Sequence, residues 1–595
     1  MSFPLTIPKG RELTGGDLLA QSLNRLGTEV AFGLHGGHLD AFLVGCESIG
    51  IRLIDTRHET VAVQAAEGYS KMAGKTGICF ITANSGFSNG LPGLATAFAD
   101  RSSILCITSS VPLRDQENNS LQGQIDQVVA ARPMTKFAHR VTNAEDLPRI
   151  VAHAVHISVS GAPGPVLLDV PIDVLFAPVS PSRISWGAVS GALPYSPGPH
   201  QGAIEEAVKL LRQAKRPAVI VGTGANSPEA STALSQFAAA TQIPIFSSGK
   251  FSILTNLYSN PSFAGPANLL AALSLGGTPP DCLLLLGART GMYLGGQSGA
   301  IVPTKDCSII QVDTDGGELG RTYPVLGIVS DTTQALLALT SALKATPFHT
   351  PPAWLQSLKT AQALPSPHDA SPPTVGGALH PHHALTALFS HLPPNPIVVL
   401  DGGEAALWAG PAALAHCQPA ALVSSTGYLG FLGNGFGYAL GCAVAAAAAD
   451  AHVVLVTGDG AAGFHIMELD TFARHGLRVL TVVVNNECWG MSANGQDMVY
   501  GGATAARPAS GLSGRVEFSV VAEGLGCAGV RCAALEEVGP GVEGVLAKAG
   551  PACVDLRVSR KPVHPGTEAM VAMTEDPDVI VVPYYDNVPR PRYKL

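Results

Sequence analysis

The sequence contains few charged residues and no run rich in lysine and arginine. Asp, Glu, Lys and Arg make up 14% of the 595 residues, and the formal net charge is −9. Nucleic acids and anionic membrane surfaces are bound by clustered positive charge, so neither is expected as a partner. We expect the ligand to be a small molecule.

Cysteine pairs with the spacing of a metal or redox site are also missing. The 11 cysteines are scattered, without a CxxC pair or a cysteine–histidine cluster, which is typical of reduced structural thiols. Residues 1–12 contain no apolar core of signal-peptide length, and we expect a cytoplasmic protein. Peroxisomal localisation is the alternative, because Tyr593-Lys594-Leu595 loosely resembles a peroxisomal address.

No hydrophobic run has the character of a membrane span. The most apolar stretch, 435–456, is dominated by Ala and Gly and is interrupted by Asp450 and His452. This pattern favours a buried helix followed by a strand. We therefore expect no membrane partner.

Length and composition predict several domains. A chain of 595 residues exceeds what one hydrophobic core usually supports. Segments 176–201 and 346–383 are rich in Pro, with Ser and Gly, and we interpret them as linkers. The predicted parts are 1–180, 200–345, 375–565 and a tail, 566–595.

Short apolar runs alternate with helical stretches throughout these parts. Nearly all-apolar runs are typical of strands that are buried on both faces of a parallel sheet. The strand candidates are 77–82, 165–170, 218–222, 282–287, 397–400 and 452–456. The predicted fold class is α/β, with three doubly wound parallel-sheet domains in series.

Two polar segments follow consecutive strands in the third domain. Gly458-Asp459-Gly460 ends one strand, a helix is predicted over 461–475, and a second strand over 478–484 ends at Asn485-Asn486. Parallel strands end at one edge of the sheet, where α/β proteins bind ligands. We therefore expect the two segments to share a site.

The residue types of these segments suit a divalent cation with a phosphate ligand. Asp459 and Asn486 offer a carboxylate and an amide oxygen, which are hard ligands for Mg²⁺. Gly458 and Gly460 allow the backbone to approach a diphosphate closely.

The span from Gly458 to Asn486 resembles the thiamine diphosphate fingerprint of the acetolactate synthase and pyruvate decarboxylase superfamily. The resemblance covers nearly the whole chain and implies pyrimidine-binding, central and diphosphate-binding domains, with thiamine diphosphate and Mg²⁺ as cofactors. It implies that the main-chain carbonyl of Cys488 is the third metal ligand. The implied cofactor contacts, besides Glu59, are Gly402, Gly403, Gly430, Leu432, Gly458, Asp459, Gly460, Asn486, Trp489 and Gly490.

The first domain contains the carboxylate that this chemistry needs. A strand over 51–56 and a helix over 60–73 place Glu59 at a helix start. Arg57-His58-Glu59 matches the family's activating segment, and the resemblance implies that Glu59 hydrogen-bonds N1′ of the cofactor. In relatives this Glu serves the cofactor of a neighbouring subunit, which implies a homodimer at least and makes a homotetramer, with active sites at subunit interfaces, the expected assembly.

Segments 32–38, 113–115 and 121–127 are most similar to benzaldehyde lyase. The resemblance implies that His38 relays protons and that Gln122 orients the substrate oxygen by hydrogen bonding. The predicted function is a carbon–carbon lyase or carboligase that forms or cleaves acyloins from aldehydes, 2-keto acids or 2-hydroxyketones.

The sequence departs from benzaldehyde lyase at pocket positions. Ile172, Ala406 and Thr426 stand where the resemblance would give Trp, Tyr and His, so the acyl donor is expected to differ from benzaldehyde. A 2-hydroxyacyl-CoA lyase or an acetolactate synthase is the alternative. The first would need basic residues to bind the phosphates of CoA, and Arg590, Arg592 and Lys594 are the only late basic cluster. FAD is not expected. A catalytically inactive regulatory or structural relative is the alternative from another class.

Overall fold

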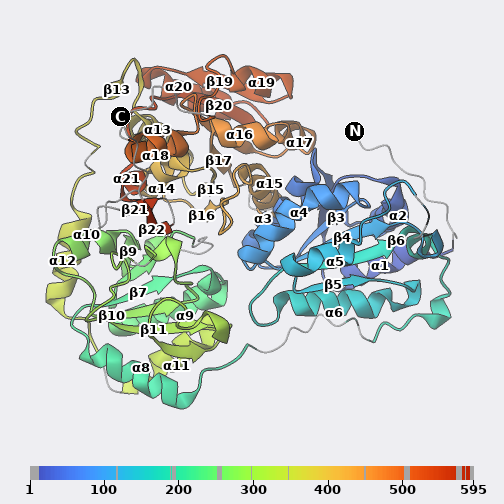
Figure 1. Cartoon of the computed structure of the whole chain (residues 1–595), viewed down its shortest axis with the longest axis horizontal. Coiled ribbons are helices and arrows are strands. Elements are labelled where there is room, and N and C mark those ends of the chain that lie inside the picture. The colour runs from blue at the N-terminus through green and yellow to red at the C-terminus, as the bar shows by residue number, and fades with distance from the viewer. Residues whose placement is uncertain are drawn as a thin grey trace.

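The computed structural model describes residues 12–115, 118, 120–187, 189, 196–250, 257–296, 298–345, 348–366, 368–447, 451–500, 509–570, 579–582 and 585–589. The basic tail residues Arg590, Arg592 and Lys594 lie outside this set. The described chain forms three six-stranded parallel sheets that are flanked by helices, which confirms the predicted fold class. Figure 1 shows them as three bodies, from blue through green to orange along the chain.

The first sheet has the strand order β2-β1-β3-β4-β6-β5. Because the order reverses between β1 and β3, the carboxyl ends of these two strands flank a crevice of the kind in which α/β sheets bind ligands. The strands are β1 (Val30–Gly33), β2 (Arg52–Asp55), β3 (Gly77–Ile81), β4 (Ile104–Ser110), β5 (Phe137–Arg140) and β6 (Val166–Pro171). The helices are α1 (Gly15–Arg25), α2 (Asp40–Ile49), α3 (Glu59–Ala73), α4 (Ser85–Ala99), α5 (Gln127–Ala131), α6 (Leu147–Val159) and α7 (Ile172–Phe176).

The second sheet has the order β12-β11-β10-β7-β8-β9 and reverses between β7 and β10. Its strands are β7 (Pro217–Val221), β8 (Ile245–Ser247), β9 (Phe263–Pro266), β10 (Cys282–Leu286), β11 (Ser308–Asp313) and β12 (Leu326–Val329). Its helices are α8 (Gln201–Gln213), α9 (Pro228–Thr241), α10 (Leu269–Leu275), α11 (Thr332–Ala345) and α12 (Pro352–Gln362).

The third sheet has the order β16-β15-β17-β18-β20-β19 and reverses between β15 and β17. Its strands are β15 (Ile397–Leu400), β16 (Ala421–Ser424), β17 (Val453–Gly458), β18 (Val479–Asn485), β19 (Ala528–Cys532) and β20 (Ala552–Arg557). Its helices are α13 (Pro381–Ser390), α14 (Glu404–His416), α15 (Gly435–Ala445), α16 (Asp459–His465), α17 (Glu468–Arg474), α18 (Gly490–Tyr500), α19 (Phe518–Gly524) and α20 (Leu535–Leu546).

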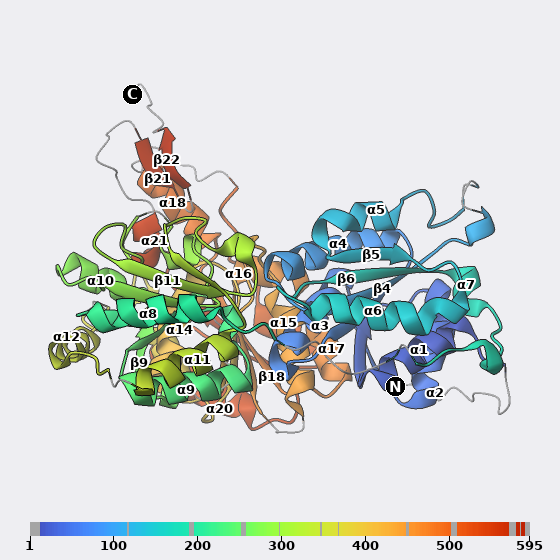
Figure 2. The same cartoon turned by 90° about the horizontal axis from the view of Figure 1, so that it is seen from below.

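Two small elements flank the third domain. The short strands β13 (Thr374–Val375) and β14 (Ala378–Leu379) lie at its start, before its sheet. The predicted tail contains α21 (Pro565–Met570) and the antiparallel pair β21 (Val579–Val582) and β22 (Tyr585–Pro589), which projects from the body in Figure 2.

The first and third domains share one hydrophobic core. Helices α3 and α15 lie side by side between the two sheets in Figures 1 and 2, and their buried side chains belong to a single cluster with both sheets. Within this interface the Gln64 side-chain amide donates to Asn434 Oδ1 (2.6 Å). The helix that begins at Glu59 is therefore fixed against the third domain of the same chain.

All six strand candidates are confirmed, as β3, β6, β7, β10, β15 and β17, but two other predictions are wrong. The helix predicted over 461–475 is two helices, α16 and α17, joined by a tighter turn with i→i+3 hydrogen bonds at Ile466 and Met467. The linker 346–383 contains α12, where Trp354 is 2% exposed and donates to the Pro217 carbonyl (2.9 Å). Proline here occupies the first turn of a helix, where no N–H is needed.

Among the described residues, no helix combines the length and the hydrophobicity that crossing a membrane requires.

Candidate functional site

Glycines at the ends of three neighbouring strands surround the reversal point of the third sheet. Gly402, after β15, has φ +93°, and a Cβ at this position would lie 3.4 Å from the Gly458 nitrogen. A Cβ on Gly460 would lie 2.6 Å from the Trp489 ring, and one on Gly490 would lie 2.7 Å from the Asn486 side chain. The structure thus brings these predicted cofactor contacts together. Gly403 adjoins them, next to the side chain of Met491.

Asp459 begins α16 at this edge and is 7% exposed. Burial raises the pKa of Asp459 to about 7, against the opposing effect of main-chain amides that include those of Glu487 and Cys488. The carboxylate therefore faces the loop that contains Asn486. A buried carboxylate with a raised pKa is stabilised in its charged form by a cation.

The donor set fits Mg²⁺ better than a softer metal. Asn486 Oδ1 accepts a hydrogen bond from the Cys488 amide (3.1 Å), so the amide oxygen and the Cys488 backbone lie in one tight loop beside Asp459. Among the described residues, no group of three or more His, Cys, Asp or Glu side chains could hold a metal ion. One carboxylate, one amide oxygen and one carbonyl, completed by phosphate and water, is a set typical of Mg²⁺.

A cavity of about 570 Å³ adjoins Asp459 and Gly460. Most of its wall is apolar, and all the described residues that line it belong to the third domain. They are Asp459, Gly460, Gly463, Phe464, Ile466, Asn485, Trp489, Leu512, Ser513, Val516, Phe518 and Val521.

The loop after β16 contains Gly430 and Leu432. Leu432 is half-buried and Gly430 is exposed, so part of each residue is accessible to a ligand. Asp401, which is fully buried, accepts from the Gly433 amide (3.1 Å) and from the Thr457 hydroxyl (3.1 Å). Burial raises the pKa of Asp401 to about 6. We did not predict Asp401 from the sequence, although a carboxylate directly after the apolar strand β15 was a usable signal.

In the first domain, Glu59 is buried, with 7% of its surface exposed. It does not cap α3, because the His58 ring accepts the Thr60 amide (3.2 Å) at that end. Glu59 Oε2 instead accepts from the Asn89 side chain (3.0 Å), and a Cβ on Gly86 would lie 3.3 Å from Oε1. Asn89 was not predicted from the sequence, since nothing in its local pattern distinguishes it.

Gln122 lies at the same edge of the first sheet. The Gln122 side-chain amide donates to Ser85 Oγ (3.2 Å), and the Gln122 main-chain carbonyl accepts from the Asn84 side chain (2.6 Å). Asn84 and Gln122 both have positive φ, +45° and +60°. Backbone strain of this kind clusters at functional sites.

His38 is half-buried and lies near this edge. Gly36, two residues before His38, and Gly86, which lies beside Glu59, both lie close to the Thr82 side chain. The His38 segment and the Glu59 site are therefore neighbours. Burial lowers the pKa of His38, and its Nδ1 has no hydrogen-bond partner among the described residues. No hydrogen bond in this part of the chain joins His38 to Glu59 or Gln122, but the neutral ring is suited to accept a proton.

Polar contacts join the Glu59 segment to the helices that follow Asp459. The Arg57 amide donates to Glu468 Oε1 (2.9 Å), and the Thr471 hydroxyl donates to Oε2 (2.6 Å). Arg474 pairs with Asp55 (2.7 Å) across the same interface. Burial raises the pKa of Glu468 to about 7.

The Glu468→Gln variant is expected to melt at a higher temperature than the wild-type apoprotein above pH 7. The folded-state pKa of Glu468 exceeds its unfolded value, so the wild type loses stability as pH rises from about 4.5 to about 7 and no further beyond. The free energy of unfolding of the wild type falls by about 1–3 kcal/mol over this pH range. Thermal unfolding between pH 5 and 8.5 would measure it; a melting difference that does not grow with pH would contradict this account.

The glycine-rich loops of the central domain are packed against each other. A Cβ on Gly222 would lie 2.4 Å from the Gly287 carbonyl oxygen, and one on Gly224 would lie 2.8 Å from Gly287 Cα. The glycines at the reversal point of this sheet are therefore needed for contact between the two backbones.

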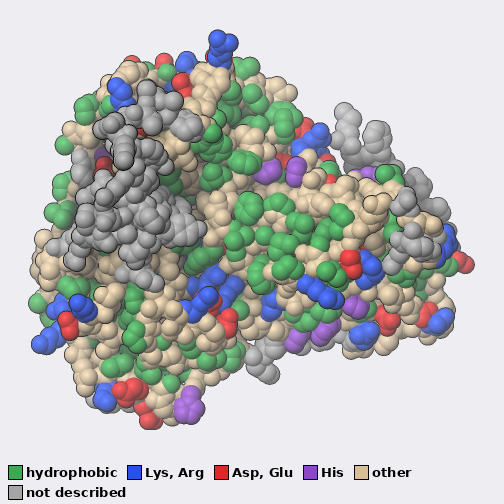
Figure 3. All heavy atoms as spheres, in the orientation of Figure 1, with side chains coloured by type: hydrophobic (Ala, Val, Ile, Leu, Met, Phe, Trp, Pro, Cys, Tyr) green, Lys and Arg blue, Asp and Glu red, His purple; other side chains and the backbone are tan. Residues whose placement is uncertain are grey.

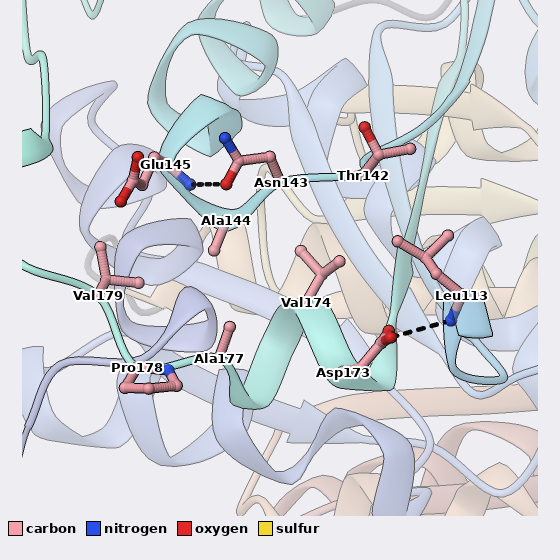
Figure 4. Close-up of a pocket in the computed structure, with 10 residues that line it drawn as sticks. All are labelled: Leu113, Thr142, Asn143, Ala144, Glu145, Asp173, Val174, Ala177, Pro178 and Val179. Atoms are coloured by element: carbon pink, nitrogen blue, oxygen red, sulfur yellow. Dashed lines mark hydrogen bonds between the residues drawn. The ribbon is translucent and has the colours of Figure 1, made fainter. Parts of the chain in front are cut away.

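A second cavity, of about 220 Å³, lies in the first domain (Figure 4). Asp173 Oδ2 at its edge accepts from the Leu113 amide (3.0 Å), and Asn143 Oδ1 accepts from the Glu145 amide (3.3 Å). None of its lining residues is a predicted site residue.

Three parts of one family match the sequence in chain order. Residues 13–130 match "Thiamine pyrophosphate enzyme, N-terminal TPP binding domain", and residues 204–339 match the central domain of that family. Residues 401–556 match its C-terminal TPP binding domain.

Relatives align with this chain over most of their own length. A probable acetolactate synthase of Mycobacterium bovis is 30% identical over 554 residues, which cover 92% of this chain and 96% of the relative. The 2-hydroxyacyl-CoA lyase 2 of Caenorhabditis elegans is 28% identical, over 86% of this chain and 83% of the relative. The crystal structure of benzoylformate decarboxylase from Polynucleobacter necessarius superposes with a TM-score of 0.77 and 19% identity, covering 92% of this chain and all of that one, which shows a common fold.

Proposed function

This chain belongs to the family of thiamine diphosphate-dependent enzymes, and we propose that it makes or breaks the carbon–carbon bond next to a carbonyl group. The proposed substrates are aldehydes, 2-keto acids or 2-hydroxyketones. The observation that carries this proposal is the pair of polar edges on two doubly wound sheets. Buried Glu59 lies at one edge, and buried Asp459 lies among glycines at the other.

Magnesium would be held by Asp459, by Asn486 and by the main-chain carbonyl of Cys488. The surrounding glycines would leave room for the diphosphate, and Trp489 would form part of the wall. Gly430 and Leu432 would contact the two rings of the cofactor. When bound, thiamine diphosphate supplies a carbon nucleophile that adds to a carbonyl and accepts the electron pair of the adjacent bond.

The first domain would supply the residues that hydrogen-bond the cofactor and the substrate and transfer protons. Glu59 would hydrogen-bond the cofactor ring, held in place by Asn89. Gln122 would orient the substrate oxygen from a backbone that the Asn84 side chain fixes. His38, whose pKa burial lowers, would accept and return a proton near neutral pH. Segments 32–38 and 121–127, in which His38 and Gln122 lie, support a reaction like that of benzaldehyde lyase.

We propose a homodimer at least, and a homotetramer as the full assembly. All the described residues that line the cavity beside Asp459 belong to the third domain, and we infer that another chain covers it. Figure 3 shows hydrophobic side chains gathered on the first domain over α5. Val129 of α5 and Ile125, two residues before this helix, are about half exposed, as is typical of an association surface.

Because its relatives include acetolactate synthases and a 2-hydroxyacyl-CoA lyase, the substrates of these two enzyme classes are the alternatives to the proposed ones. FAD is not part of the proposal, because the packed loops at Gly222 and Gly287 favour a structural role for the central glycines. We propose a cytoplasmic location; the residues that suggest a peroxisomal address, Tyr593 to Leu595, lie outside the described chain.

Purified protein supplied with thiamine diphosphate and Mg²⁺ is expected to form or cleave hydroxyketones from a panel of aldehydes, 2-keto acids and acyloins. Mass spectrometry of the products, against a reaction without cofactor, identifies the substrate class. Turnover of 2-hydroxyacyl-CoA alone, or of pyruvate to acetolactate alone, would replace the proposed substrate class. No turnover with any member would favour an inactive relative.

A further inference from the structure

The loop from Ser424 to Gly433, here called the cofactor loop, is held by residues of the other two domains. Figure 1 shows that β16, which leads into it, lies on the side of the third domain that faces them. The first contact comes from Lys250 of the central domain, whose ammonium group donates to the Ser424 carbonyl (3.1 Å). The second comes from Asp100 of the first domain, whose Oδ1 accepts from the Tyr428 amide (3.0 Å).

Lys250 and Asp100 also bind each other. Lys250 Nζ lies 2.6 Å from Asp100 Oδ2, and their side chains are 3% and 0% exposed. Charge-assisted bonds between buried groups are short and directional, so the pair fixes the position of both ends. Because each partner also binds the cofactor loop, the pair joins all three domains at one point.

Two further charged groups of α3 complete this cluster. Lys71 Nζ lies 3.7 Å from Asp100 and 3.4 Å from Glu67, which accepts from the Ser102 hydroxyl (2.7 Å). Two cations and two anions therefore balance in a buried volume. A balanced, hydrogen-bonded cluster tolerates burial, whereas removal of one member leaves an uncompensated charge.

The central domain makes two more contacts with the cofactor loop. The Tyr293 hydroxyl donates to the Gly427 carbonyl (3.0 Å), and its ring packs against that of Tyr428 at 5.1 Å. The Arg289 guanidinium lies 3.8 Å above the Tyr428 ring. The segment 424–428 is thus bound at three backbone groups, those of Ser424, Gly427 and Tyr428, just before Gly430 and Leu432.

We propose that Lys250, Tyr293 and Asp100 are positioning residues, through which the central and first domains hold the cofactor loop in the conformation that binds the cofactor rings. The inference rests on the proposed role of Gly430 and Leu432. It assigns the central domain a part in cofactor binding, although the glycine loops at the reversal point of its own sheet pack against each other. The backbone from Tyr428 to Leu432 spans few bonds, so a fixed Tyr428 amide limits where the Gly430 carbonyl can point.

The mildest test removes one hydroxyl. Tyr293→Phe is expected to weaken thiamine diphosphate binding about three- to tenfold, the loss of one hydrogen bond, and to speed amide hydrogen exchange in peptides spanning 424–433 of the apoprotein. Tyr323→Phe is the matched control, because the Tyr323 hydroxyl also donates to a main-chain carbonyl, that of Gly296, within the central domain. Equal effects of both variants on the loop and on affinity would overturn the proposal.

A second test separates positioning from stability. Lys250→Met is expected to destabilise the fold, because Asp100 stays buried with less compensation. The double variant Lys250→Met with Asp100→Asn removes both charges, and the new side chain can still accept the Tyr428 amide. We expect its melting temperature to recover toward the wild-type value while exchange at Ser424 to Gly427 stays fast. Wild-type exchange in a folded double variant would overturn the proposal.

The two proposals fail separately. Absence of thiamine diphosphate binding to wild-type protein by calorimetry would refute the proposed function, whereas hydrogen exchange of the apoprotein measures the cofactor loop without any ligand. Rapid exchange over 424–433 in the wild-type apoprotein would overturn the positioning role alone.

Discussion

Replacing Glu59 with Gln is expected to lower turnover by about two to four orders of magnitude while the chain stays folded and binds thiamine diphosphate with Mg²⁺. Glutamine has nearly the same shape, but it has no proton to exchange with the cofactor ring. The side chain is buried and accepts from Asn89, and the carboxamide oxygen can still accept that hydrogen bond. The loss should therefore fall on kcat rather than on cofactor affinity.

Steady-state kinetics with the substrate identified by product analysis, combined with calorimetry of cofactor binding, would measure both quantities. Glu47→Gln is the matched control, because Glu47 lies on the exposed face of α2 in the same domain. Near-normal turnover of the Glu59 variant would remove Glu59 from the mechanism. Loss of cofactor affinity with unchanged kcat would instead make it a binding residue.

Replacing Asp459 with Ala is expected to weaken Mg²⁺-dependent binding of thiamine diphosphate by at least about 100-fold, and activity should disappear with it. Asp459 contributes the only carboxylate among the three proposed metal ligands. Without it, Asn486 and the Cys488 carbonyl offer two neutral oxygens, which hold a divalent cation weakly. Alanine creates no clash, because its side chain is smaller than that of aspartate.

Calorimetric titration with thiamine diphosphate at fixed Mg²⁺ would measure this affinity. Asp146→Ala provides a comparison, since the Asp146 side chain is 46% exposed in the first domain, and it should bind the cofactor like the wild type. An unchanged dissociation constant for the Asp459 variant would refute the metal assignment. Circular dichroism spectra of both variants would show that the fold is retained.

Local sequence was sufficient to predict secondary structure where one type of interaction dominates over a few residues. Runs such as 282–287 and 397–400 are short and nearly all apolar, as is typical of strands covered on both faces, and they form β10 and β15. The Gly-Asp-Gly turn likewise identified the end of β17 and the start of α16. Segment 346–383 shows the limit of this approach, because proline marks a linker and a first helical turn alike, and only the burial of Trp354 distinguishes them.

The candidate site was predictable in part for the same reason. Asp459 and Asn486 follow strands that are close in sequence, so their common edge could be derived from the alternation of strand and helix. Asn89 was missed because its role depends on a partner, Glu59, that local pattern does not connect. Asp401 directly follows β15, but only its contact with Gly433 shows what the carboxylate holds.

The sequence by itself determined the class of fold, the strands and the residue types at their ends, because hydrophobic periodicity and turn chemistry act over short stretches of chain. Tertiary structure decided the order of strands, hence the position of each crevice, and the contacts at the cofactor loop. The Tyr428 amide meets Asp100 from 328 residues away, and the Ser424 carbonyl meets Lys250 from 174 residues away. Such pairs form only when the three domains pack together, and packing depends on the shapes of whole surfaces rather than on any local pattern.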